Sequence, residues 1–310
     1  MAYSHNDPAL VAVGGLTIDY VQTRAGLSGP AVGGNALYAA VGAWLVGSQP
    51  TILAKVGRDY PTELLGPLDA AGFDLGSIET VSGPSFKVVL DESTGRRIQR
   101  YLPGSGDNST LDPGVDSLPV MSQKAAHVCG IPVSTQRQFL LAMRGRAALL
   151  TFDTVVIPGH IEPSASELDE LMDYSDLFLP SREEVAALWL VDDVDRWVLA
   201  QAQRGRKVVV KCGAEGAISV SDNGDLIRME AAPARVIDTT GAGDTFCGAF
   251  ASTLRSHGDT RSAMAWAAAA ASVVIEGHGA LHAVVKDRRK DVKDRAGALL
   301  GAVRVERGGQ

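Results

Sequence analysis

Short apolar runs, several of them continuous rather than alternating, constrain the fold of this chain more than any other sequence feature. They are rich in Val, Ile and Leu and begin at Leu10 (LVAVGG), Pro50 (PTILAKVG), Ala126 (AHVCG), Ala148 (ALLTFD), Asp176 (DLFLP) and Lys207 (KVVVKCG). A strand covered on one face alternates between apolar and polar residues, whereas a strand of a sheet covered on both faces is apolar throughout. Segments with helical spacing separate the runs, at 34–45, 62–71, 135–143, 183–190 and 245–257. This alternation predicts an open α/β sheet.

One region departs from this alternation. Residues 85–102 (SFKVVLDESTGRRIQRYL) alternate with period two on both sides of the turn DESTG, which is typical of a β-hairpin. Together with an irregular piece at 20–32, we expect this region to form a small β element beside the main sheet. The segments 20–32 and 85–107 then form either a lid over a cleft or an ordinary edge hairpin. The remainder of 1–310 is interpreted as the α/β core of the same single domain.

The composition restricts the partners and the compartment of the chain. Its 310 residues include 36 acidic and 29 basic ones, a net charge of −7, which argues against nucleic acid or an anionic membrane as a partner. The three cysteines lie far apart in sequence, so we expect no disulfide framework and a reducing cytoplasm. The longest apolar stretch, 263–275, is too short to span a bilayer, and the N-terminus has no signal-peptide pattern. We therefore expect a complete cytoplasmic protein, whose charged end from Lys286 forms a solvated helix with a frayed tail.

The stretch ARVIDTTGAGDTFCGAF, at 234–250, carries the most distinctive chemistry. Gly241 and Gly243 leave the backbone free of side chains, so that N–H groups can turn toward an anion. Beyond them, apolar residues recur every four positions, at Phe246, Phe250 and Leu254. This spacing predicts a helix, and a helix N-terminus can hold a phosphate or a developing oxyanion.

Asp244 follows these glycines and has two interpretations. It is either a helix N-cap, which is a common use of Asp, or the acceptor of a proton from an attacking hydroxyl. The preceding glycines favour the second interpretation. Motifs of other enzyme classes are absent, namely the P-loop, the dinucleotide-binding G-x-G-x-x-G after the first strand, H-E-x-x-H and G-x-S-x-G. The six scattered histidines predict no metal-ligand cluster.

DTTGAGDTFCGAF resembles the C-terminal signature of the PfkB, or ribokinase-like, family of carbohydrate and nucleoside kinases. In chain order, further segments resemble that family: VAVGGLTIDY, AVGGNALYAAVGAWLVG, AKVGRDYPTELLGPLDAAGFDL, FLPSREEVAAL and VVVKCGAEGAISV. The resemblance implies a central, mostly parallel sheet flanked by helices, with a small β lid. It also implies an ATP- and Mg²⁺-dependent phosphotransferase that acts on a hydroxyl, expected to be primary, of a small sugar or sugar derivative.

The same resemblance assigns roles around the glycine turn. Asp244 is implied as the catalytic base, and the amides of Gly241, Ala242 and Gly243 as the anion hole for the transferring phosphoryl group. Family members often bind a monovalent cation near this turn. Asp238 and Thr240 are the candidates to offer carbonyl oxygens to such an ion, with K⁺ as the expected species.

On the acceptor side, the resemblance implies a hydroxyl-binding Asp19 and a glycine pair, Gly33 and Gly34, that lets the backbone approach the substrate. A carboxylate can accept hydrogen bonds from two hydroxyls, although an Asp at a strand end is also a common turn residue. Asn35 follows the pair and is either a substrate ligand or a helix N-cap. Tyr38 stands where many members have Asn, which leaves the substrate identity open.

On the nucleotide side, the resemblance implies roles for two segments. Ser181 replaces the usual Asn of the family's Asn-x-x-Glu, while Glu184 keeps its place and would act on Mg²⁺ through water or simply be an acid in a first helical turn. Lys211 replaces a common Thr and either reaches an ATP phosphate or lies at the surface. Gly213 and Gly216 belong to the same nucleotide-side turn.

Alternatives to a sugar kinase remain. A nucleoside is the nearest alternative substrate, but the aromatic content of 5% favours a sugar, because a base needs aromatic or broad apolar walls. The replacements at Ser181 and Lys211 leave open a catalytically weak sugar- or nucleotide-binding regulatory protein. Arginines of the hairpin, Arg96, Arg97 and Arg100, either clamp an acidic substrate or guard a strand edge. A homodimer through the lid is left open.

Overall fold

The central sheet is six-stranded and parallel, in the order β10-β9-β8-β1-β4-β5. The computed structural model describes residues 10–23, 26–91, 98–121, 124–221, 223–301 and 304–306 of the chain. Its strands are β1 (Leu10–Val13), β4 (Pro50–Gly57), β5 (Ile78–Val81), β8 (Ala125–Val128), β9 (Leu149–Phe152) and β10 (Leu177–Phe178). The apolar runs of the sequence thus form a parallel sheet, and the predicted α/β fold is confirmed.

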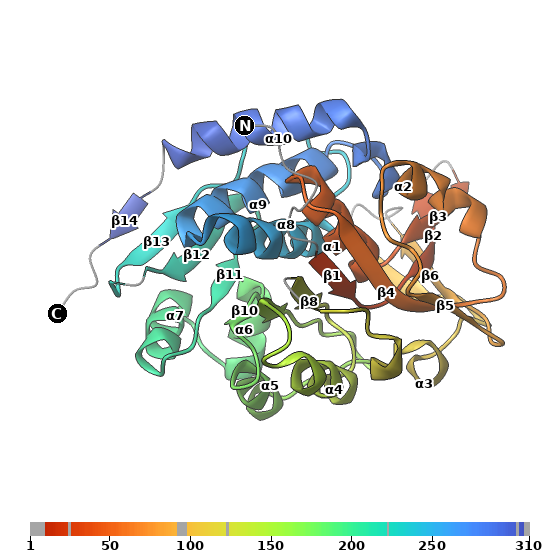
Figure 1. The fold of residues 1–310 in the computed structure, drawn as a ribbon, viewed down its shortest axis with the longest axis horizontal. Helices are drawn as coiled ribbons and strands as arrows, with labels where there is room; N and C mark the ends of the chain where they lie inside the picture. The colour runs from red at the N-terminus through yellow and green to blue at the C-terminus, as the bar shows by residue number, and fades with distance from the viewer. Residues whose placement is uncertain are drawn as a thin grey trace.

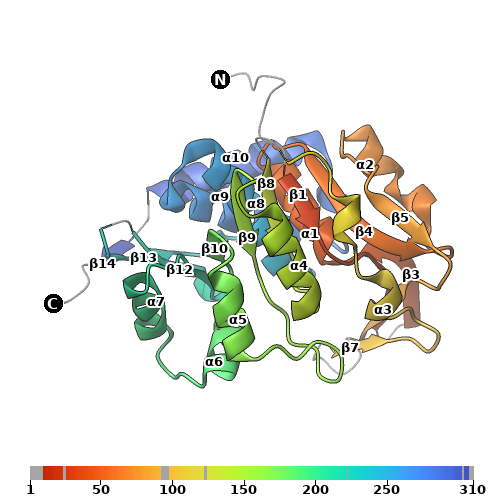
Figure 2. The same ribbon diagram turned by 60° about the horizontal axis from the view of Figure 1, so that its bottom comes forward.

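Helices cover both faces of this sheet (Figures 1 and 2). One layer contains α1 (Asn35–Leu45), α8 (Ala242–His257), α9 (Thr260–Val274) and α10 (Lys286–Leu300). The opposite layer contains α4 (Val133–Met143), α5 (Ala165–Met172), α6 (Arg182–Trp189) and α7 (Val194–Gln203). The helix predicted at 62–71 is divided into a 3₁₀ turn, Thr62–Leu65, and α2 (Gly66–Ala70), while α3 (Asn108–Leu111) is a single turn.

Burial on both faces explains why the central strand β1 is apolar throughout. In β1, Leu10 and Ala12 belong to the cluster that includes α1, α8 and α9. Val11 and Val13 belong to a second cluster, which includes α4 and α5 on the other face. All four side chains are fully buried, so a polar residue at any of these positions would lose its hydration without gaining a partner.

A four-stranded sheet of order β3-β2-β6-β7 lies at one end of the molecule (Figure 1). Its strands are β2 (Thr17–Thr23), β3 (Gly26–Gly33), β6 (Phe86–Asp91) and β7 (Ile98–Tyr101). The antiparallel pair β6 and β7 confirms the predicted hairpin. The piece at 20–32 was expected to join this hairpin in a small β element, and this is confirmed, because β2 pairs with β6 and with β3, with a register shift between Asp19 and Val21. Glycines and a proline in β3 conceal its strand pattern from sequence inspection.

A third sheet has the order β11-β12-β13-β14 and antiparallel pairing. It consists of β11 (Val209–Lys211), β12 (Ala217–Val220), β13 (Leu226–Met229) and β14 (Arg304–Glu306). Parallel bridges from Phe178 to Val208 and from Ser181 to Lys211 join it to the central sheet. The helix expected from Lys286 is α10, but the frayed tail is a wrong expectation for 304–306, because β14 pairs with β13.

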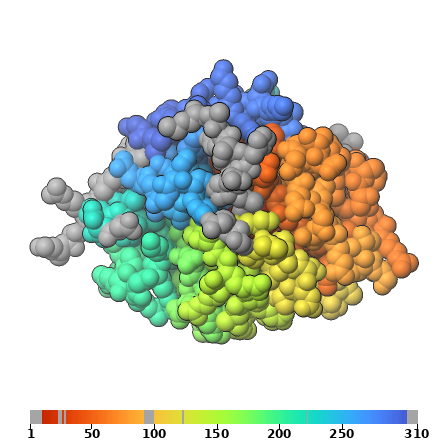
Figure 3. Space-filling model, in the orientation of Figure 1, coloured from red at the N-terminus to blue at the C-terminus, as the bar shows by residue number. Residues whose placement is uncertain are grey.

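Segments that are distant in sequence meet on the surface. The C-terminal helices (blue), the first strands with α2 (red to orange) and the middle of the chain (green) occupy separate sectors of one face (Figure 3). Arg289 of α10 also contacts α1, because its guanidinium carbon lies 4.0 Å from the centre of the Trp44 ring. Within the described part of the chain, no helix combines the length and apolarity needed to cross a bilayer.

Candidate active site

A cavity of about 480 Å³ lies where loops after the central parallel strands meet the β3-β2-β6-β7 sheet. Loops at the carboxyl ends of parallel strands are the usual position of binding sites in open α/β sheets. Ten of the residues predicted from sequence line it: Asp19, Gly34, Asn35, Ser181, Glu184, Lys211, Thr240, Gly241, Gly243 and Asp244. The structure therefore brings the predicted acceptor side, nucleotide side and glycine turn together in one cavity.

The glycine turn is fixed by a tyrosine ring. Gly241 is the N-cap of α8 and has a left-handed φ of 71°. A Cβ at this position would lie 2.1 Å from the ring of Tyr38, so only glycine fits between the turn and α1. Tyr38 lines the cavity and also supports the turn.

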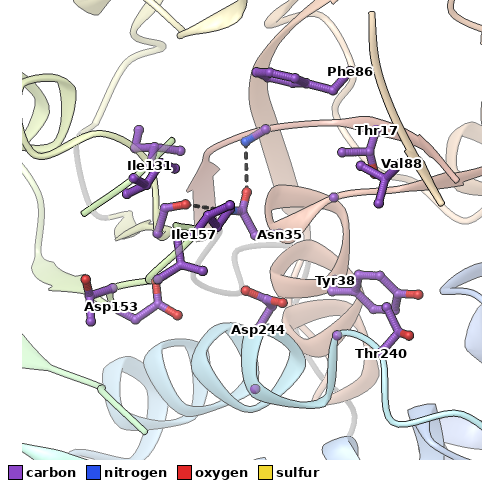
Figure 4. A pocket seen from close by; sticks show the side chains of 18 of the residues that line it. Thr17, Asn35, Tyr38, Phe86, Val88, Ile131, Asp153, Ile157, Thr240 and Asp244 are labelled. Carbon is purple, nitrogen blue, oxygen red and sulfur yellow. Dashed lines mark hydrogen bonds between the residues drawn. The ribbon is translucent and has the colours of Figure 1, made fainter. Parts of the chain in front are cut away.

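Asp244 is the third residue of α8, so the N-cap interpretation of this residue is wrong. Its position in the first turn places the carboxylate beside the helix N-terminus, and the side chain points into the cavity together with Asp153 (Figure 4). The N–H groups of a first helical turn have no acceptor within the helix. Among them, Ala242 donates to the carbonyl of Thr239 at 3.3 Å, so this amide is already engaged.

Four charged side chains gather at the floor of the cavity. Burial, followed by the negative charge of Asp153, raises the pKa of Asp244 to about 7. The ammonium of Lys211 lies 3.3 Å from Oδ2 of Asp153 and 3.2 Å from Sγ of Cys247. Burial alone would lower the pKa of Lys211, but Cys247, Asp153, Glu184 and Asp244 outweigh it and raise that pKa. The surface alternative for Lys211 is therefore wrong.

Beneath Lys211 lies a polar cluster that sequence reasoning missed. His127, Asp153 and Cys247 are buried, and their potential ligand atoms lie within 4.8 Å of one another. Thr151 Oγ1 donates to the Ala126 carbonyl and faces Nδ1 of His127 at 3.0 Å, which assigns the ring proton to Nδ1.

The remaining ring atom of His127 faces a carboxylate. Its Nε2 lies 3.8 Å from Oδ1 of Asp153, and neither atom has a hydrogen-bond partner among the described residues. Burial lowers the pKa of His127 to about 3, so the ring is neutral. Because the Lys211 ammonium already balances Asp153, the cluster supports the cavity floor, to which Asp153 itself belongs. An Asp directly after an apolar strand was the only sequence signal for it.

Ser181 and Glu184 form a capping box at the start of α6. The hydroxyl of Ser181 accepts from the N–H of Glu184 at 3.2 Å, and Oε2 of Glu184 accepts from the N–H of Ser181 at 2.7 Å. Burial raises the pKa of Glu184. Both residues line the cavity as well, so the capping role and a role toward a ligand coexist at this position.

On the acceptor side, the carboxylate of Asp19 fills the space beside Gly33. A Cβ on Gly33 would lie 1.9 Å from Oδ2 of Asp19, so this glycine makes room for a side chain of the protein rather than for the substrate. Gly34 has a φ of 105° and is the N-cap of α1, so the N-cap interpretation of Asn35 is wrong. The side chain of Asn35 instead accepts from the N–H of Gly15 and donates to the carbonyl of Gly130, both at 2.8 Å (Figure 4).

Asp238, Gly213 and Gly216 were also predicted from sequence but do not line the cavity. Oδ1 of Asp238 accepts from the N–H of Thr240 at 2.8 Å and closes the turn before Gly241. Gly213 and Gly216 bracket the turn between β11 and β12, with φ values of 55° and 91°. A Cβ on Gly216 would lie 1.9 Å from the carbonyl oxygen of Met229, which explains that glycine structurally.

The chain is similar to known kinases. The family model for pfkB carbohydrate kinases matches residues 20–287. A cytidine kinase of Thermococcus kodakarensis is 24% identical over 251 residues, covering 78% of this chain and 86% of that protein. A ribokinase of Schizosaccharomyces pombe is 23% identical over 246 residues, covering 76% of each. The structure of aminoimidazole riboside kinase from Salmonella enterica, complexed with aminoimidazole riboside and an ATP analog, has a TM-score of 0.74 at 18% identity, covering 93% of this chain and 99% of that one.

Proposed function

Because the chain belongs to the pfkB family of carbohydrate kinases, we propose that it transfers the γ-phosphoryl group of ATP to a hydroxyl, expected to be primary, of a small sugar or nucleoside. The observation that carries this proposal is the partly buried carboxylate of Asp244, which follows the Gly241–Gly243 turn and faces the cavity. A base and an anion-binding backbone lie side by side there, as phosphoryl transfer requires.

Asp244 is proposed to accept the proton of the attacking hydroxyl. The hydroxyl oxygen forms the new bond to the γ-phosphorus, its proton passes to the carboxylate, and ADP leaves with the electrons of the broken P–O bond. A base is most effective when its pKa lies near the working pH, and the pKa of Asp244 is raised to about 7.

The transferring phosphoryl group is proposed to rest on the N-terminus of α8. The amides of Gly241 and Gly243 are offered as its donors, while Ala242, whose N–H already donates to Thr239, makes a smaller contribution than the sequence suggested. The partial positive charge of the helix end acts in the same direction.

Lys211 is proposed to contact an ATP phosphate from beside this turn. Its Nζ would lie 3.6 Å from a Cβ on Gly243, so the ammonium reaches the position where the phosphates are expected. Gly213 and Gly216, in the turn that follows β11, are proposed to flank the rest of the nucleotide.

Metal ions are proposed at two positions. Glu184 presents a partly buried carboxylate at the cavity, which is the ligand type that Mg²⁺ prefers. We assign it to Mg²⁺ through water, with Ser181 orienting the carboxylate. Mg²⁺ would neutralise charge that develops on the phosphates. The carbonyl oxygens of Asp238 and Thr240 are proposed for K⁺.

On the acceptor side, Asp19 is proposed to accept hydrogen bonds from substrate hydroxyls. Its carboxylate already accepts from Thr17 Oγ1 through Oδ1, which orients it beside the cavity. Gly34 and Asn35 are proposed to form the adjoining wall, and the two backbone contacts of Asn35 hold that wall in place.

The proposal is tested by incubating the protein with ATP, Mg²⁺ and K⁺ and each of a panel of sugars, sugar acids, sugar phosphates and nucleosides. ADP formation together with a new phosphomonoester signal in ³¹P NMR is the expected result for at least one acceptor. Binding of ATP and acceptor without any phosphomonoester would contradict the kinase and favour a catalytically weak binding protein.

A further inference from the structure

The acceptor end of the cavity has an apolar wall contributed by β6 and β7. Phe86, Val88 and Leu90 line the cavity, and their spacing of two places them on one face of β6. Tyr101 is paired with Val88 across the β6–β7 ladder and also lines the cavity. The rings of Phe86 and Tyr101 have centroids 5.8 Å apart and are tilted by 44°. The two rings therefore form one continuous aromatic surface.

A polar strip runs beside this wall on the neighbouring strand β2. In the parallel β2–β6 pairing, Thr17 lies opposite Phe86 and Asp19 lies opposite Val88. Thr17 donates its hydroxyl proton to the carboxylate of Asp19. A hydroxyl-binding carboxylate is thus one strand away from an aromatic wall, so an acceptor that fits both must have a hydroxyl-bearing part and a flat apolar part.

Loops after β8 and β9 supply further apolar surface to the same cavity. Ile131, Ile157 and Ile161 line it, and Ile131 and Ile157 lie at the left of the close view, with Phe86 and Val88 at its top and right (Figure 4). The ring of His160 in this loop packs edge-on against Tyr101, with centroids 4.7 Å apart. That contact holds the Tyr101 ring in place.

We propose that the acceptor is a nucleoside, with its ribose hydroxyls at Asp19 and its base against Phe86 and Tyr101. The proposal rests on the kinase function and names its substrate class. Stacking of a base on an aromatic side chain strengthens binding substantially, whereas a free pentose would leave the apolar wall uncovered. The low aromatic content of the chain favoured a sugar in the sequence analysis. Composition does not show where aromatic residues lie, and two of them, Phe86 and Tyr101, lie in this wall.

Arg100, the one hairpin arginine among the described residues, does not support an acidic acceptor. Arg100 is exposed and pairs with Asp91 of β6 at 3.1 Å, and it does not line the cavity. Arg96 and Arg97 lie outside the described residues. Acidic sugars are therefore included for comparison in the substrate experiment, and they are not proposed as the acceptor.

The experiment compares kcat/KM for adenosine, cytidine, D-ribose, D-fructose, D-gluconate and ribose 5-phosphate, measured by ADP formation with wild-type protein. We expect at least one nucleoside to exceed every sugar and sugar acid by at least about 100-fold, in line with the effect of base stacking. A sugar, sugar acid or sugar phosphate with an equal or higher kcat/KM overturns the nucleoside assignment and leaves the kinase function standing.

Two variants test whether the aromatic wall causes the expected preference for a nucleoside over ribose. Phe86→Ala and Tyr101→Ala are each expected to lower the nucleoside-to-ribose ratio of kcat/KM at least about tenfold, mainly through the KM of the nucleoside. Val89→Ala is the matched control, since Val89 is a buried residue of the same strand that does not line the cavity. An unchanged ratio in both aromatic variants, or an equal fall in the control, overturns the role of this wall.

A binding measurement separates the two proposals if no acceptor is phosphorylated. Calorimetric titration of adenosine and cytidine into wild-type protein and Phe86→Ala does not require turnover. Binding that weakens in the variant supports the nucleoside site although the kinase function has failed. Absence of binding to both nucleosides overturns the nucleoside site as well.

Discussion

At the scale of single residues, the ionisation of Asp244 determines whether the proposed reaction can proceed. Its pKa is raised to about 7, first by burial and then by the charge of Asp153. A protonated carboxyl cannot accept a proton, so kcat/KM is expected to fall about tenfold per pH unit below pH 7 and to level off above it. Initial rates from about pH 5.5 to about pH 8.5 measure this profile.

Asp153→Asn provides the control for that profile. Removing its negative charge eliminates one cause of the raised pKa, so the inflection is expected to move to lower pH. A wild-type profile that stays flat across this range would show that Asp244 is not the titrating base. An inflection that does not move in the variant would remove Asp153 from the explanation.

Lys211 forms an ion pair with Asp153 and is proposed to contact an ATP phosphate, and two variants separate these roles. Lys211→Met leaves the buried Asp153 without its cation, and the free energy of unfolding is expected to fall by about 3–5 kcal/mol. The double variant Lys211→Met/Asp153→Asn removes both charges and is expected to recover most of that loss. If Lys211 contacts an ATP phosphate, the KM for ATP stays raised in both variants.

Denaturant unfolding and ATP titration of the two proteins make these measurements. A double variant that regains both stability and wild-type KM for ATP would restrict Lys211 to a structural role. A single variant of wild-type stability would contradict the buried ion pair.

Residues that share one turn were predictable from their own pattern, whereas distant residues of the cavity were predictable only through the family resemblance, which does not reveal their contacts. Gly241, Gly243 and Asp244 could be assigned because one turn contains them all. His127, Asp153 and Lys211 come from three strands or strand ends, and no spacing in the sequence indicates that they meet. The same limitation concealed the contact between Gly241 and Tyr38.

At the scale of elements, the two ends of α8 provide an internal comparison. Gly241 and Gly258 flank this helix with nearly equal φ values of 71° and 69°, but only Gly241 is packed against another side chain. Gly258→Ala is expected to reduce stability by about 1–2 kcal/mol, the cost of a left-handed alanine. Gly241→Ala adds a collision with Tyr38, so we expect a larger loss of stability and a fall in kcat.

Thermal unfolding and kcat are measured for both glycine variants and for Gly241→Ala/Tyr38→Ala. The double variant is expected to recover part of the stability, because it removes the colliding ring. Equal losses in the two single variants would contradict the role assigned to the Tyr38 contact.

Elements were predictable where one physical pattern dominated the local sequence. Strand β1 is apolar on both faces, and this pattern is visible without a structure. In β3, glycines and Pro30 interrupt the alternation, and only pairing with β2 defines the strand. The short strand β14 is charged at both ends and exists through its pairing with β13, which no local propensity indicates.

At the scale of the whole molecule, the β3-β2-β6-β7 sheet and the central sheet enclose one cavity, and a ligand that fills it contacts both. Bound ligand stabilises the states that bind it, so exchange of amide hydrogens is expected to slow in β2 and β6 when acceptor and ATP are added. Helix α5 is the internal control, because none of its residues lines the cavity. Hydrogen exchange read by mass spectrometry tests this; slowing in α5 without any slowing in β2 and β6 would contradict the position of the site.

The assignment of Asp244 as the base is the central claim, and Asp244→Asn tests it most directly. The ionised carboxylate opposes folding above pH 7 because its pKa is raised in the folded state, so the Asn variant is expected to fold at least as well as wild type at pH 8. Asp259→Asn is the matched control, since Asp259 caps α9 at the surface and Asn caps equally well.

The measurement is kcat for ADP formation at pH 8 with the best acceptor, for both variants beside wild type. The account predicts a loss of about 10²–10⁴-fold for Asp244→Asn and a wild-type rate for Asp259→Asn. A folded Asp244→Asn protein that retains kcat within about tenfold of wild type would contradict the assignment of this residue as the base.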